Sequence, residues 1–77
     1  MKQYSIFLLE SGEAYPIFQT EDGKEFYLGG NGLKNLLFSN KAVAEKTARL
    51  IRKTDRYLAR SGKIKVLKAK ITASNYN

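Results

Sequence analysis

Apolar and polar positions alternate at both ends of the chain, whereas apolar positions recur at helical spacing between them. Residues 3–9 (QYSIFLL) are apolar on both alternating faces, with Ile6 and Leu8 on one face and Phe7 and Leu9 on the other. Two apolar faces are typical of a strand that is covered on both sides. We therefore predict a strand that is central in its sheet or lies at a dimer contact.

A β-hairpin is the clearest local pattern in the first half. Residues 15–20 resemble a short strand that tolerates Pro16 near its start, and residues 25–28 resemble its partner. Between them, Asp22-Gly23 is a pair preferred in two-residue hairpin turns. We predict that residues 15–28 form a hairpin.

The glycine-rich residues 29–32 (GGNG) interrupt the strand pattern. They lack the Lys-Ser/Thr ending of a phosphate-binding loop and do not lead directly into a helix, so a flexible turn is the favoured interpretation. Residues 33–38 (LKNLLF) favour a fourth short strand. The alternative is an irregular segment that tucks its apolar side chains under the following helix.

A long helix is predicted next. Ser39 and Asn40 are both suitable N-caps, and Gly62 is expected to form a left-handed C-terminal cap after residues 42–59. About 20 residues at 1.5 Å each give a rod of about 30 Å. At 100° per residue one face is largely apolar, and we expect it to pack on the sheet. This face comprises Val43, Ala44, Thr47, Leu50, Ile51, Thr54, Tyr57 and Leu58.

The last strand is expected in residues 63–72 (KIKVLKAKIT). Its alternation changes phase between Val66 and Leu67, which predicts a β-bulge. Residues 73–77 are expected to be a frayed tail. The elements then follow the order β-β-β-(β)-α-β. The fold class is α+β, with residues 1–72 as one domain in which one long amphipathic helix packs across a small, mostly antiparallel sheet.

Length and composition limit the classes of protein. The 77 residues suffice for one domain, and nine aromatic side chains favour a folded core. Because Cys and His are absent, we predict no disulfide, no metal site and no cofactor. The four consecutive apolar residues 6–9 are too few for a signal-peptide core or a membrane span. We expect a cytoplasmic protein of bacterial or phage-like origin, without membrane association.

Catalysis is not predicted. The commonest general base and the thiol nucleophile are both missing, and the carboxylates Glu21, Asp22 and Glu25 cluster in a hairpin turn. The one enzyme class that remains conceivable is a small basic ribonuclease, with Tyr57 beside Arg56 as its candidate. We predict a non-enzymatic protein.

Positive charge is concentrated in the second half. Residues 1–38 have three cations and five acids, whereas residues 39–77 have eleven cations and only Glu45 and Asp55 as acids. One helix face is expected to carry a row of cations at spacings of 3, 4, 3 and 4. The row comprises Lys46, Arg49, Lys53, Arg56 and Arg60, and Arg52 flanks it.

Like charges four residues apart, such as Arg49–Lys53 and Arg56–Arg60, each oppose the helix by about 0.2–0.5 kcal/mol. That cost favours a binding role over the alternative of a solvated face. Lys63 and Lys65, with Lys68 and Lys70, extend the charge into the last strand.

The sequence leaves two questions open: the role of the lysines in the last strand, and the exposure of the aromatic residues in the hairpin. The lysines of the last strand either enlarge the basic field or protect an edge strand from pairing, and the phase change leaves the faces of Lys68 and Lys70 open. Exposed aromatic side chains would favour binding of single-stranded nucleic acid or RNA. Tyr15 and Tyr27 are expected in the core, and their exposure would be the exception.

The favoured function is a small accessory protein that binds DNA or RNA through backbone phosphates, with little base specificity. One alternative is a protein–protein interaction module or inhibitor that docks its basic face on an acidic partner. Another is a homodimer of unknown function whose charge maintains solubility. The candidate polyanion-binding residues are Lys46, Arg49, Arg52, Lys53, Arg56, Arg60, Lys63 and Lys65.

Overall fold

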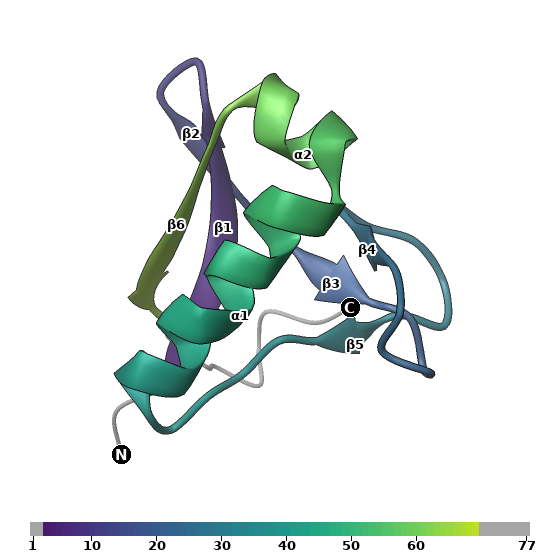
Figure 1. The fold of residues 1–77 in the computed structure, drawn as a ribbon, viewed down its shortest axis with the longest axis vertical. Helices are drawn as coiled ribbons and strands as arrows, with labels where there is room; N and C mark the ends of the chain where they lie inside the picture. Colours follow the sequence, from purple (N-terminus) through teal and green to yellow (C-terminus); the bar gives the residue numbers. More distant parts are fainter. Residues whose placement is uncertain (1–2, 70–77) are drawn as a thin grey trace.

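The computed structural model describes residues 3–69, which form an α+β fold of two small sheets and two helices (Figure 1). The predicted fold class is confirmed, and the predicted tail, residues 73–77, lies outside the described residues. The elements are β1 (Tyr4–Glu10), β2 (Glu13–Pro16), β3 (Phe18–Gln19), β4 (Phe26–Tyr27), β5 (Lys34–Asn35), α1 (Lys41–Thr54), α2 (Arg56–Ser61) and β6 (Lys63–Lys68).

The first sheet has the antiparallel order β2-β1-β6, so the doubly apolar strand is central, as predicted. Its Ile6 and Leu8 are fully buried on the face that the helices cover. The predicted bulge in the last strand is wrong. Ile6 pairs with Val66 and the adjacent residue pairs with Leu67, without an inserted residue. Because of the phase change, Leu67 lies on the outer face of the sheet instead of the face of Ile64 and Val66, and it is 38% exposed.

The second sheet has the order β4-β3-β5 and contains the predicted hairpin in shortened form. The predicted strand 15–20 is divided, because Tyr15 and Pro16 pair with β1 and only Phe18–Gln19 pair with β4. Its turn is held by Asp22, whose carboxylate accepts hydrogen bonds from Thr20 Oγ1 at 2.6 Å and from the Lys24 backbone N–H at 3.0 Å. Gly23 has a φ of 74°, a conformation that glycine adopts without strain. Of residues 33–38, only Lys34–Asn35 form a strand.

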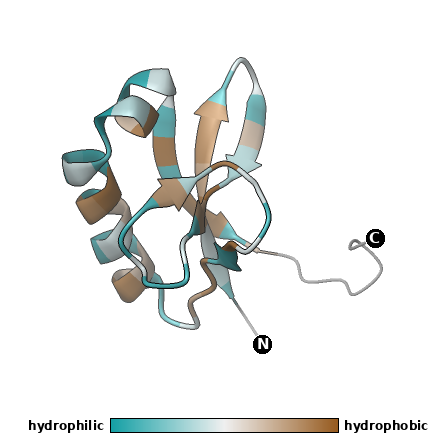
Figure 2. Cartoon of the chain, turned by 90° about the vertical axis from the view of Figure 1, so that its right-hand side faces the viewer, coloured by the Kyte–Doolittle hydropathy of each residue, from teal (hydrophilic) through white to brown (hydrophobic). Residues whose placement is uncertain are grey.

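The core lies between the helices and both sheets. Ile17 connects the sheets, because its N–H donates to Ile6 O at 2.9 Å and its side chain is buried. Hydrophobic segments occupy the strands beside α1, and α1 itself alternates between hydrophobic and hydrophilic segments (Figure 2). The core cluster comprises Ile6, Leu8, Ile17, Phe26, Leu36, Ala48, Ile51, Leu58 and Ile64.

The predicted long helix is present as two helices that meet at Asp55. Asn40 is the N-cap of α1, as predicted, and its Oδ1 accepts from Ala42 N at 2.8 Å. Asp55 leaves the helical conformation with φ −107° and ψ 89°, and its carboxylate caps α2 by accepting from Leu58 N at 3.0 Å. Asp favours helix starts over interiors because its side chain competes for backbone N–H groups. No helix within residues 3–69 has the length and apolar character that a bilayer span requires.

The buried face of α1 agrees with the predicted face at Ala44 and Ile51 but not elsewhere on this helix. Ala44, Ala48 and Ile51 are fully buried, whereas Val43 and Leu50 are 48% and 52% exposed. The two alanines have almost no side chain, so the backbone of α1 can approach the sheet closely along their flank. The helix is therefore rotated away from Val43 and Leu50.

Gly62 joins α2 to β6 in an extended conformation, with φ 176°, and the predicted left-handed cap is wrong. A glycine is nevertheless required, because a Cβ at this position would collide with the backbone oxygen of Leu9. The corner between α2 and β6 thus passes directly against β1.

Candidate polyanion-binding surface

Three cations form a row on the exposed face of α1. Lys46, Arg49 and Lys53 are all exposed, and their Cα atoms extend over about 10 Å of helix. Together with Thr47 and Leu50 they line a surface hollow of about 480 Å³. We call Lys46, Arg49 and Lys53 the α1 row.

No carboxylate among residues 3–69 neutralises the α1 row by a direct ion pair. Four of the seven carboxylates in this part of the chain accept hydrogen bonds from hydroxyl groups or backbone amides. Glu13 accepts from Tyr15, Glu25 from Tyr27, and Asp55 from Leu58 N. Glu45 lies on α1, four residues before Arg49, and is the acid nearest to the row in sequence. The α1 row and Glu45 together carry three cations and one acid, so this surface stays net positive.

The helix break separates the remaining two cations of the predicted row. Arg56 and Arg60 are exposed on α2, beyond the non-helical Asp55, so the spacing of 3 and 4 does not continue as one face. Arg56 lines a hollow of about 330 Å³ together with Glu25 and Asp55. Arg56 therefore has two acidic neighbours.

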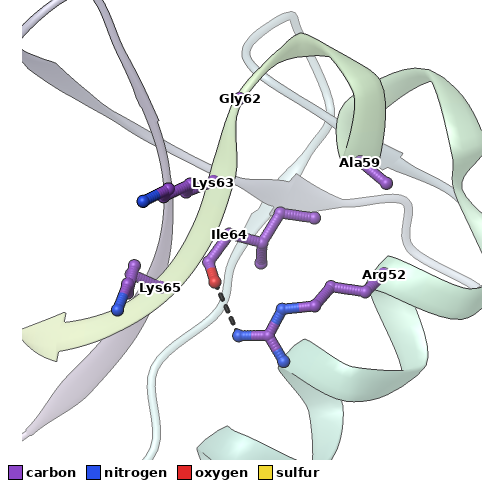
Figure 3. A pocket seen from close by; sticks show the side chains of 6 residues that line it. All are labelled: Arg52, Ala59, Gly62, Lys63, Ile64 and Lys65. Atoms are coloured by element: carbon purple, nitrogen blue, oxygen red, sulfur yellow. Dashed lines mark hydrogen bonds between the residues drawn. The ribbon is translucent and has the colours of Figure 1, made fainter.

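Arg52 lies on another side of α1 and contacts β6 (Figure 3). Its Nη2 donates to the backbone oxygen of Ile64 at 2.6 Å. Arg52 and Ile64 line a hollow of about 340 Å³ together with Ala59, Gly62, Lys63 and Lys65. Arg52 therefore has a structural role in joining α1 to β6, which the charge pattern of the sequence did not predict.

Lys63 and Lys65 do not join the α1 row. They alternate along β6 with Ile64, which is buried under the helices, so their side chains leave from the opposite face of the sheet. There Lys65 is paired with Phe7 in the antiparallel register. The aliphatic part of a lysine can cover an apolar neighbour while its ammonium group stays in water. Lys68 shares the alternation of Ile64 at the exposed end of β6, and Lys70 lies outside the described residues.

The exposed aromatic residues differ from expectation. Tyr27 is 45% exposed and Tyr15 is half-buried, so Tyr27 is the exception to the predicted core placement. Each phenol donates to a nearby glutamate, and the hydrogen bond to Glu25 raises the pKa of Tyr27 above its ordinary value of 10.0. Tyr57, which was predicted to face the sheet, is 77% exposed.

No chemical centre other than the charged surfaces emerges in the described part of the chain. Residues 3–69 contain no group of three His, Cys, Asp or Glu side chains placed to hold a metal ion. In the glycine-rich turn, Gly30 and Gly32 have φ values of 140° and 76°, which favour glycine over other residues.

The chain matches no family model, and comparison with curated proteins and with solved structures gives no significant match.

Proposed function

We propose that this chain is a small, non-enzymatic accessory protein that binds nucleic acid through contacts between the α1 row and backbone phosphates. The observation that carries the proposal is three exposed cations on one face of α1, a helix whose single acid is Glu45. Neutralising phosphates releases condensed counterions, which supplies affinity that is independent of sequence. Such a ligand implies an intracellular protein.

The dimensions of the α1 row support this geometry. Its length of about 10 Å corresponds to about three base-pair steps of a duplex, at about 3.4 Å per step. Phosphate contacts carry no direct sequence information, so weak discrimination between sequences is expected. Three duplex contacts predict a slope of about −2.7 in log K against log salt, and five contacts, with Arg56 and Arg60 included, about −4.5.

The test is a binding titration with fluorescent duplex and single-stranded oligonucleotides at a low and a high salt concentration. Replacing Lys46, Arg49 and Lys53 together by Gln should weaken binding uniformly across sequences. It should also reduce the magnitude of the salt slope by about 2.7.

A matched control removes the same charge elsewhere, through Gln at Lys24, Lys34 and Lys68, which are all exposed. If the α1 row is the site, the control weakens binding much less than the row variant does. Equal losses in the two variants, or no binding by the unmodified chain at low salt, would overturn the proposal.

A further inference from the structure

A stripe of two apolar residues and two threonines lies on α1 beside the buried face, with Val43, Leu50 and Thr54 exposed and Thr47 half-buried. Val43, Thr47, Leu50 and Thr54 follow spacings of 4, 3 and 4, which is the pattern of a helix–helix seam. The side-chain hydroxyls of Thr47 and Thr54 donate to the oxygens of Val43 and Leu50, at 3.1 and 2.7 Å. Since both hydroxyls donate within the helix, neither threonine leaves an unsatisfied donor on this surface. We call these four residues the α1 stripe.

The hollow beside the α1 stripe has the form that receives a side chain from a second helix. Lys46, Arg49, Leu50 and Lys53 stand at positions i, i+3, i+4 and i+7, and Leu50 is half-exposed among three cations. In knobs-into-holes packing, four residues of one helix form the hole for a side chain of the facing helix. The aliphatic parts of lysine and arginine add apolar surface to such a hole.

We propose that the α1 stripe and this hollow dock an acidic amphipathic helix of a partner protein. Its apolar side chains would lie along the α1 stripe, one of them in the hollow at Leu50, and its flanking carboxylates would meet the α1 row. Charge complementarity selects this occupant over a second copy of the chain. Two copies packed through this face would place Lys46, Arg49 and Lys53 of each chain near like charges.

Docking of an acidic helix at the α1 stripe goes beyond nucleic-acid binding and does not depend on it. Both ligands use the cations of the α1 row, but only the helix uses Leu50. An acidic helix bound at the hollow would therefore displace a nucleic acid from the α1 row, so this face would bind one ligand at a time.

The experiment uses the full chain and a synthetic helical peptide of about three heptads, with Leu at the seam positions and Glu on both flanks. A control peptide has the same composition in scrambled order, so it keeps the charge and loses the apolar seam. Leu50→Ala is compared with Leu37→Ala, which truncates a leucine of similar exposure (41% against 52%) that lies outside α1. Calorimetric titration measures affinity, and circular dichroism verifies that each variant is folded.

The seam peptide should bind in the micromolar range, and Leu50→Ala should weaken it about tenfold. Leu37→Ala should leave it unchanged, and the scrambled peptide should bind less tightly. Equal binding of both peptides would overturn the proposal, because charge alone would then explain the interaction. The absence of binding, or an unchanged affinity in Leu50→Ala, would also overturn it.

Two further measurements address other occupants of the α1 stripe. Sedimentation equilibrium of the chain alone would overturn the proposal if it showed a dimer that Leu50→Ala dissociates. Binding to phosphatidylserine vesicles that Leu50→Ala abolishes, with no binding of the seam peptide, would assign the stripe to a membrane surface instead. Leu50→Ala retains the α1 row, so oligonucleotide binding should be unchanged, and the two proposals can fail independently.

Discussion

Arg52 and Ile64 join α1 to the open edge of β6, since Nη2 of Arg52 donates to the Ile64 backbone oxygen at 2.6 Å. Ala69 N donates to Gln3 O, so the odd-numbered residues of β6 are those that bond to β1. The backbone groups of Ile64 therefore point away from the sheet. Arg52 satisfies a carbonyl at this edge and obstructs its pairing with another strand.

Replacing Arg52 with Ala should lower the free energy of unfolding by about 1 kcal/mol, because this hydrogen bond is lost. Urea denaturation measures the change. Arg49→Ala is the control, because Arg49 is exposed on the same helix and should change stability by less than about 0.5 kcal/mol. Equal losses in the two variants would show that helix propensity, not the contact to Ile64, is responsible.

Replacing Gly62 with Ala should destabilise the fold by about 1–3 kcal/mol, because the new Cβ meets the backbone oxygen of Leu9 and β1 must shift. Gly29→Ala is the matched control. A Cβ at Gly29 meets no atom within 4 Å, and the reduced freedom of the unfolded chain can even stabilise the protein. Thermal and urea unfolding of both variants measure the difference, and a neutral Gly62→Ala would contradict the close approach of this corner to β1.

Asp55→Ala should cost about 1 kcal/mol of stability, because α2 loses the carboxylate that caps Leu58 N. Asp55→Asn retains an acceptor oxygen and should recover most of the loss. Denaturant unfolding of the two variants provides the comparison. A neutral effect of Asp55→Ala would contradict the prediction that this cap stabilises α2.

The turn of the β3–β4 hairpin should weaken in acid. The hydrogen bond from Thr20, followed by that from the Lys24 backbone, holds the pKa of Asp22 below its ordinary value of 3.8. A lowered pKa in the folded state contributes stability that is present above pH 3.8 and is lost as pH falls through the folded pKa. NMR titration of Asp22 measures this directly. Thr20→Val should raise the pKa of Asp22 towards 3.8, whereas Thr20→Ser should preserve its depression.

Local interactions explain which parts of the fold were predictable. The N-cap at Asn40 and the turn at Asp22-Gly23 depend on neighbours within a few residues, so sequence patterns identify them. The central position of β1 follows from two apolar faces. The break at Asp55 was not predicted, because the capped break and a continuous helix differ little in free energy. The apolar spacing of the segment also continues unchanged through Asp55.

The sequence by itself determined the α+β class and the excess of positive charge after residue 39. Only the tertiary structure decided how that charge is divided among the α1 row, the contact of Arg52 with β6, and the outer face with Lys63 and Lys65. Helical periodicity defines an apolar sector but not which flank of it touches the sheet. Close approach along Ala44 and Ala48 made that choice, and it left the α1 stripe uncovered.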